Sequence, residues 1–145
     1  MNLFGMLGVS GSALTAERQR AEVVAANMAN AETTRTPEGG PYRRKLVVFK
    51  SQEEPRFPRM LNAGLLKSNA PGVQVEQVVA DTSPPEMRYE PGSPDANDQG
   101  FVAYPNIDPV NEMVDLMGAV RAYEMNSSAV QATKQMIQQS IDLLR

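Results

Sequence analysis

The chain contains neither cysteine nor histidine among its 145 residues. Without cysteine it lacks thiolate nucleophiles, disulfides and thiolate ligands for zinc. Without histidine it lacks the side chain that titrates near neutral pH when unperturbed. Paired carboxylates such as Glu53 and Glu54 are only sequence neighbours and do not define a catalytic cleft. We therefore predict that the protein is not an enzyme and that it holds no cofactor or metal.

A surplus of positive charge is also missing. The sequence has 14 basic and 17 acidic residues, which leaves a formal net charge of -3. Nucleic-acid binders and proteins that adhere to anionic membranes usually carry a basic excess. We therefore expect no nucleic acid and no membrane surface as a partner.

Long apolar runs are missing as well. No segment approaches the roughly 20 apolar residues that cross a bilayer. The apolar opening from Leu3 to Val9 is interrupted by Gly5 and Gly8, and no basic residue precedes it, because the first charged residue is Glu17. This pattern is untypical of a secretory signal. We expect a soluble chain with no transmembrane segment and no cleaved signal peptide.

Proline is absent from both ends of the chain. All 11 prolines lie between Pro37 and Pro109. Because proline disrupts helix interiors, two helix-compatible ends flank a helix-breaking middle. We predict an α+β fold with an N-terminal helical segment over 1–36, a β-rich, loop-rich middle domain over 37–107 and a C-terminal helical segment over 108–145.

The N-terminal segment carries a helical apolar stripe. Its members recur every seven residues, and they are Leu7, Leu14, Ala21 and Met28. We predict one helix from about Ser10 to Asn30, where Asn30 can adopt a left-handed cap before the threonines that precede Pro37. Gly8 and Gly11 leave the start of the helix open.

The C-terminal segment has a sharper predicted start. Asp108 can cap the first turn, and Pro109 occupies the first helical position, where no amide donor is needed. The expected helix runs from Pro109 to about Leu144. Its stripe repeats every seven residues and has supporting offset positions: Leu116, Tyr123, Val130, Ile137 and Leu144, with Met113, Val120 and Ile141.

Such stripes must be covered by another surface, because isolated helices owe little of their stability to propensity. The two terminal helices can pack on each other as a hairpin over a small middle domain, or they can form a coiled coil that depends on partner chains. The spacing alone leaves both alternatives open. The predicted assembly interface consists of both stripes: Leu7, Leu14, Ala21, Met28, Met113, Leu116, Val120, Tyr123, Val130, Ile137, Ile141 and Leu144.

The middle of the chain predicts two short strands, over 44–50 and 73–80, because β-branched and apolar residues cluster or alternate there. The segment Asp95–Gly100 imitates the start of a calcium-binding loop, but Asn106 stands where the loop needs a bidentate Glu, so we interpret it as a polar turn. Gly39-Gly40-Pro41 is likewise interpreted as a turn. The basic triplet Arg43–Lys45 indicates a solvated strand edge rather than a nucleic-acid site.

Several segments resemble a known family. They are Ser12–Arg18 followed by Ala26–Asn30, the stretch Thr34–Lys45, and in the last part Gly100–Asn106, Glu112-Met113 and Arg121–Asn126. Together they resemble the axial proteins of the bacterial flagellum, and within these the C-type proximal-rod subunits. Glu32 and Val120 depart from the family pattern, which affects local packing only.

The resemblance implies a structural subunit of the proximal rod of the flagellar basal body, which assembles with other rod proteins into a hollow axial shaft that transmits torque. The terminal helices would pair as a coiled coil near the axis, with the middle domain facing outward. The implied partners are copies of the chain, other rod subunits, the rod adaptor at the membrane-side ring and the type III export apparatus. Export would proceed without a cleaved signal, and the rod would lie in the periplasm. The alternative is a small self-contained α+β binding module with no flagellar role.

Overall fold

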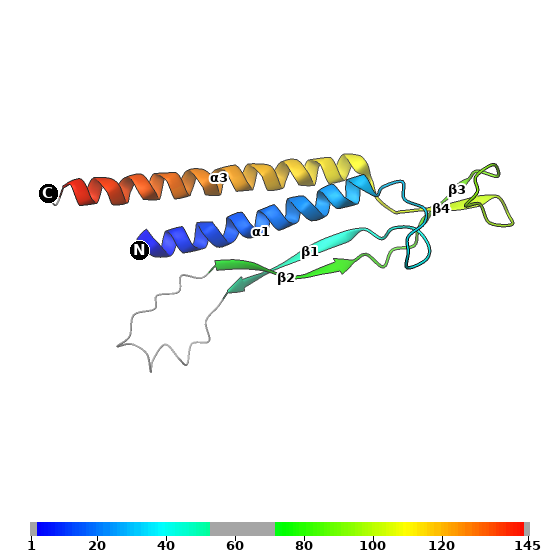
Figure 1. The fold of residues 1–145 in the computed structure, drawn as a ribbon, viewed down its shortest axis with the longest axis horizontal. Coiled ribbons are helices and arrows are strands. Elements are labelled where there is room, and N and C mark those ends of the chain that lie inside the picture. The colour runs from blue at the N-terminus through cyan, green and yellow to red at the C-terminus, as the bar shows by residue number, and fades with distance from the viewer. Residues whose placement is uncertain (1–2, 53–71, 144–145) are drawn as a thin grey trace, which may run out of the picture. The chain divides into compact units, whose positions relative to one another are not determined.

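The computed structural model describes residues 3–52 and 72–143 (Figure 1). Two long helices and four strands make up the described chain. They are α1 (Leu3–Ala29), β1 (Lys45–Gln52), β2 (Gly72–Ala80), β3 (Glu86–Tyr89), β4 (Phe101–Tyr104) and α3 (Pro109–Asp142). The predicted α+β class is therefore confirmed. Neither helix has an apolar stretch of the length and hydropathy that crossing a membrane requires, as far as the described residues extend.

The chain forms two compact units, and each unit draws on both helices and on the β1–β2 sheet. One contains α1 as far as Gln19, the described residues between Phe49 and Glu76, and α3 from Ala119 onward. The other contains Arg20–Val48 and Gln77–Gly118. We call them the terminal unit and the inner unit. The three-part division of the sequence by proline content stays a prediction.

The start of α3 follows the predicted capping. The Val110 N–H donates to Asp108 Oδ1 at 2.9 Å, and the Glu112 N–H donates to the Asp108 carbonyl at 3.1 Å. The Asp108 side chain thus satisfies the Val110 amide, which has no partner within the helix, and its carbonyl accepts the first regular helical bond. Pro109 has no amide to satisfy. At about 1.5 Å per residue, the 34-residue helix is about 50 Å long.

The start of α1 lies earlier than expected, at Leu3 instead of about Ser10, so Gly8 and Gly11 lie inside the helix. Each interior glycine costs about 1 kcal/mol relative to alanine. A tertiary contact in the terminal unit helps to offset this cost. The Val73 N–H of β2 donates to Ser12 Oγ at 3.1 Å, and Ser12 Oγ donates in turn to the Val9 carbonyl at 2.8 Å.

The end of α1 is capped differently from the prediction. No described residue other than glycine has a positive φ, so the expected left-handed conformation of Asn30 is wrong. Instead, Asn30 Nδ2 donates to the Ala26 carbonyl at 2.8 Å, and Thr33 Oγ1 donates to Asn30 Oδ1 at 3.2 Å. The Ala26 carbonyl also accepts the Asn30 backbone N–H at 3.1 Å, so the side chain adds a second hydrogen bond to the last turn of the helix.

The two predicted strands are confirmed as β1 and β2, which pair with each other and run in opposite directions (Figure 1). The Asp81 N–H donates to the Arg44 carbonyl at 2.7 Å, which extends the pairing just beyond the strand ends. Lys50 and Glu76 form a cross-strand ion pair of 2.6 Å in the terminal unit. The sequence prediction of a turn at Gly39-Gly40 is also confirmed, since both glycines have positive φ.

A second hairpin, β3–β4, lies in the inner unit and was not predicted. Its register pairs Glu86 with Tyr104 and Tyr89 with Phe101. The predicted polar turn at 95–100 is confirmed: Asn97 Oδ1 accepts the N–H groups of Gln99 and Phe101 at 3.0 and 2.9 Å. Gly100 has φ +79, and a Cβ there would lie 2.9 Å from Tyr89 Cε2, so this position requires glycine.

The core is small and partly polar. Among residues 3–52 and 72–143, the buried apolar residues are Ala16, Val24, Val102, Ile107 and Ala119. Asn27, Glu112 and Thr133 are buried as well, and they are polar or charged. Since a buried polar group is costly without partners, the contacts of these three residues decide how the fold is held together.

Candidate assembly site: a buried polar cluster between the helices

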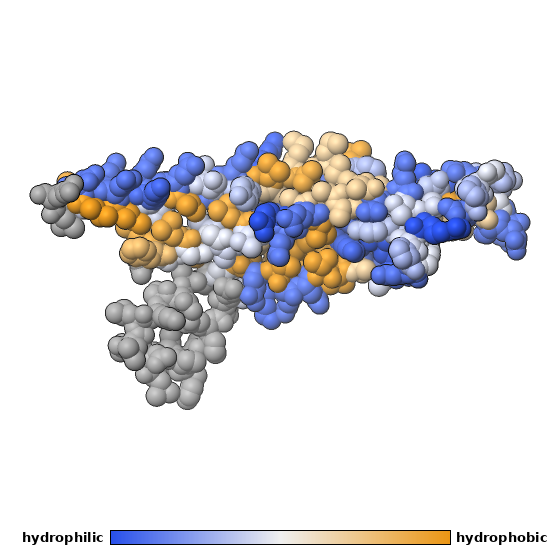
Figure 2. Space-filling view, in the orientation of Figure 1, coloured by the Kyte–Doolittle hydropathy of each residue, from blue (hydrophilic) through white to orange (hydrophobic). Residues whose placement is uncertain are grey.

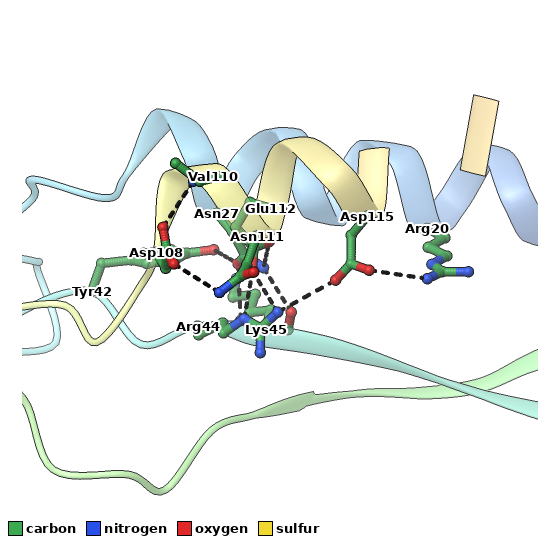
Figure 3. Close-up of polar contacts among 10 residues, drawn as sticks. All are labelled: Arg20, Asn27, Tyr42, Arg44, Lys45, Asp108, Val110, Asn111, Glu112 and Asp115. Carbon is green, nitrogen blue, oxygen red and sulfur yellow. Dashed lines mark hydrogen bonds and ion pairs between the residues drawn. The ribbon is translucent and has the colours of Figure 1, made fainter. Parts of the chain in front are cut away.

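Asn27 lies near the end of α1 and is only 1% exposed. Its Nδ2 donates to the Lys45 carbonyl at 2.9 Å and to Glu112 Oε2 at 3.0 Å. Its Oδ1 accepts the Lys45 N–H at 2.9 Å and the Tyr42 hydroxyl at 3.2 Å. Both donors and both acceptor sites of the amide are therefore used. One side chain thus joins α1, the start of β1 and α3 (Figure 3).

Glu112 lies on the first turn of α3 and is also 1% exposed. Arg44, just before β1, approaches its Oε1 with both Nε and Nη2 at 2.5 Å. Arg44 Nη2 also lies 3.5 Å from Asp115 Oδ2, and Arg20 of α1 lies 3.5 Å from Asp115 Oδ1. Because Arg20 meets Asp115 and Asn27 meets Glu112, α1 and α3 run antiparallel within the inner unit.

We call Asn27, Tyr42, Arg44, Lys45 and Glu112 the Asn27 cluster. Two guanidinium groups and two carboxylates neutralise one another in and beside it (Figure 3). Burial, followed by the nearby Glu112 charge, raises the pKa of the Tyr42 hydroxyl above its ordinary value. Both effects disfavour the phenolate, so Tyr42 stays a hydrogen-bond donor to Asn27 at neutral pH.

On α1, the four predicted interface residues all lie at half-buried positions. They are Leu7 and Leu14 in the terminal unit and Ala21 and Met28 in the inner unit. The fully buried positions of α1 are Ala16, Val24 and Asn27. The role of the predicted stripe in assembly stays a prediction.

On α3, the predicted stripe divides into two groups. Leu116, Val130 and Ile137 are half-buried, whereas the other described members are exposed: Met113, Val120, Tyr123 and Ile141. Leu144 lies outside the described residues. The buried residues of α3 are Glu112, Ala119 and Thr133, and none of them belongs to the predicted stripe.

The Asn27 cluster was not predicted from the sequence. The interpretation of Arg43–Lys45 as a solvated edge is wrong for Arg44, because this side chain is turned toward Glu112, which lies 68 residues later. No composition or periodicity signal pairs two residues so far apart. A signal did exist in the family motifs, since Asn27, Arg44 and Glu112 all belong to the segments that carry the resemblance.

Family models match both ends of the chain. Residues 7–35 match the flagella basal body rod protein model. Residues 98–143 match the model of the flagellar basal body rod FlgEFG protein C-terminal region. The two matches contain most of α1 and all of α3.

Curated relatives match the chain over its whole length. The flagellar basal-body rod protein FlgC of Bacillus subtilis is 43% identical, with 99% of each chain covered. FlgC of Escherichia coli O6:H1 is 38% identical over 99% of this chain and 98% of its own. FlgC of Borreliella burgdorferi is 37% identical over 100% of this chain and 99% of its own. The chain belongs to the FlgC family of basal-body rod proteins.

The segments that resemble the FlgC family supply the residues of the Asn27 cluster. The segment Ala26–Asn30 supplies the buried amide of Asn27 and the capping amide of Asn30. The segment Thr34–Lys45 supplies Arg44 and Tyr42, and Glu112-Met113 supplies the buried carboxylate. Motifs that lie far apart in the sequence therefore meet at one site that joins both helices to the sheet.

Proposed function

We propose that the protein is a structural subunit of the flagellar basal-body rod. The observation that carries this proposal is similarity to FlgC rod proteins along the whole chain, including a 43% identical relative. The cluster fits a structural role, because its charged groups are turned toward one another and serve to join α1, β1 and α3. We assign the protein no catalytic activity.

The proposal includes a finer assignment. The subunit belongs to the proximal rod and assembles there with copies of itself and with other rod proteins into a hollow shaft that transmits torque. The rod lies in the periplasm. Its remaining partners are the rod adaptor at the membrane-side ring and the type III export apparatus. This assignment rests on the family resemblance.

We also propose that α1 and α3 pair as a coiled coil in the assembled rod. Support comes from the alternating three- and four-residue spacing of inward positions on α3, which include Leu116, Ala119, Val130, Thr133 and Ile137. The inner unit supports the same arrangement, since the two helices are already antiparallel neighbours there. The half-buried stripe of α1 supplies the apolar surface that such a pair needs.

A deletion strain tests the proposed function. Cells that lack the chain are expected to build no complete rod and to be unable to swim, and expression of the full chain is expected to restore both. The measurement is electron microscopy of isolated basal bodies, combined with swimming assays and detection of the tagged chain in the same preparations. Complete basal bodies in the deletion strain would refute the proposal and support the self-contained module instead.

A further inference from the structure

The β3–β4 hairpin is attached to the rest of the inner unit by few contacts. Residues 81–85 and 105–108 connect it to β2 and α3, and they belong to no helix or strand. Within 86–104 the only buried residue is Val102, at 1% exposed, whereas all four residues of β3 are exposed. Figure 2 shows mostly hydrophilic surface over the end of the chain that Figure 1 labels β3 and β4. Apolar packing therefore gives the hairpin a single buried anchor.

The loop that joins β3 to β4, residues 90–100, is closed by its own backbone hydrogen bonds. The Glu90 N–H donates to the Gly100 carbonyl, and the Asn97 N–H donates to the Phe101 carbonyl, each at 2.9 Å. A third bond runs from the Gly100 N–H to the Asn97 carbonyl at 2.8 Å. These bonds hold the shape of the loop, but they do not determine its position relative to α1.

One side chain of this loop reaches the segment that follows α1. Asp95 Oδ2 accepts the hydroxyl of Thr34, 61 residues earlier, at 2.7 Å, and Asp95 Oδ1 lies 2.7 Å from Arg35 Nη2. In the described part of the chain, these are the only hydrogen bond and the only ion pair between residues 86–104 and the remaining residues. Both oxygens of one carboxylate thus connect the hairpin to the end of α1.

We infer that Asp95 acts as a latch that fixes the orientation of the β3–β4 hairpin relative to the end of α1. Burial of Val102 is non-directional, so it holds the hairpin close without setting its angle. Hydrogen bonds depend on angle, and two donors on one carboxylate define both a distance and a direction. Without the latch, the hairpin and its loop move as one piece about the connections at 81–85 and 105–108. This inference concerns the single chain, so it goes beyond the proposed rod function and does not depend on it.

The two contacts of the latch differ in exposure. The Arg35 side chain is 75% exposed, and ion pairs of exposed side chains contribute little because water and salt screen them. Thr34 is half-buried, and its hydroxyl forms a charge-assisted hydrogen bond with the carboxylate. We therefore expect the Thr34 hydroxyl to contribute more to the latch than Arg35 does.

Spin labels on two introduced cysteines measure the orientation directly, because the chain has no cysteine of its own. Suitable positions are Ala25 of α1 and Gln99 of the loop, which are both exposed. Pulsed electron paramagnetic resonance gives the distribution of distances between the two labels in the purified chain. We expect this distribution to be at least about twofold wider in Asp95→Ala than in the labelled parent chain. Asp98→Ala is the matched control, because Asp98 is exposed in the same loop and the variant loses the same charge. Equal widths for Asp95→Ala and Asp98→Ala would overturn the latch.

Variants of the two donors test the latch from its other side. Thr34→Val is expected to widen the distribution nearly as much as Asp95→Ala, and Arg35→Gln is expected to widen it less. The double variant Thr34→Val with Asp95→Ala should be no wider than Asp95→Ala alone, because both changes remove the same bond. Thr34→Val retains the size of the side chain, so it tests the latch even if Asp95→Ala lowers the stability of the chain. A distribution in Thr34→Val as narrow as that of the parent chain would overturn the inference.

Discussion

The two halves of α3 differ in which side of the helix is charged. In the inner unit, Glu112 and Asp115 point inward and the exposed side is apolar. In the terminal unit Ala119 and Thr133 are buried, and the charged residues lie on the exposed side, together with apolar residues such as Met125 and Ile141. That exposed side includes Gln131, Lys134, Gln135, Gln138 and Gln139. One continuous helix thus turns carboxylates inward in one unit and keeps its charged residues exposed in the other.

The comparison shows that hydropathy alone does not decide which side of a helix is buried. A carboxylate can be buried where cations and hydrogen-bond donors meet it, although the cost of desolvation offsets much of the attraction. Glu112 meets Arg44 and Asn27, whereas no such partners are needed around Ala119. The inward charges also leave the apolar side free for contact with other molecules.

The largest expected effect comes from breaking the buried ion pair. Arg44→Met would leave the Glu112 carboxylate buried without its cation, which should lower the free energy of unfolding by about 3–5 kcal/mol. Urea denaturation of the purified chain measures this change. Arg43→Met is the matched control, because Arg43 is exposed, and it should change stability by no more than about 0.5 kcal/mol. Equal losses for the two variants would contradict the importance of the pair.

A smaller effect is expected from Asn27. Asn27→Ala would remove the partners of both backbone groups of Lys45, and a stranded buried group costs about 1–3 kcal/mol. Asn126 provides the comparison in the terminal unit, since its Nδ2 donates only to the Ala122 carbonyl of the same helix. Asn126→Ala should alter stability by less than about 0.5 kcal/mol, because alanine favours helix. The difference between the urea midpoints of the two variants measures this contrast. A larger loss of stability for Asn126→Ala than for Asn27→Ala would contradict the prediction.

Thr133 provides a further comparison, because it is a buried polar residue in the part of α3 that belongs to the terminal unit. Its Oγ1 donates to the Ala129 carbonyl four residues earlier, at 2.8 Å. Thr133→Val replaces the hydroxyl with a methyl group and strands no group on another element. We expect a change below about 1 kcal/mol in urea denaturation. A loss as large as that of Asn27→Ala would show that both halves depend on buried polar contacts.

The smallest expected effect is a pH dependence of the free energy of unfolding that arises from Tyr42 in the Asn27 cluster. Since the pKa of Tyr42 is raised in the folded chain, the unfolded chain releases this proton at lower pH, near the ordinary value of 10.0. The folded state then binds more protons, so the stabilising contribution is complete below that pH and is lost as pH rises through the folded pKa. Urea midpoints from about pH 8 to about pH 11 should decline less steeply for Tyr42→Phe than for the parent chain. Urea midpoints that decline equally with pH in Tyr42→Phe and in the parent chain would exclude this contribution of Tyr42.

Much of the secondary structure could be predicted from the sequence, because its causes are local. Asp108 and Pro109 determined where α3 begins, and the absence of proline from both ends allowed two long helices. The runs of β-branched residues determined β1 and β2. By contrast, β3 and β4 each span only four residues, which is too short for a clear alternation, and they form because the turn at Asn97 brings them together.

Which residues form the Asn27 cluster became clear only from the tertiary structure. The sequence established the seven-residue stripe of α3, yet Met113 and Val120 from that stripe are exposed, whereas Glu112 is buried. Helical periodicity reports which residues share a face, but it cannot report which face meets a cation supplied by Arg44, 68 residues away. The residue pattern therefore determined the helices, and long-range charge pairing decided which side of α3 is turned inward.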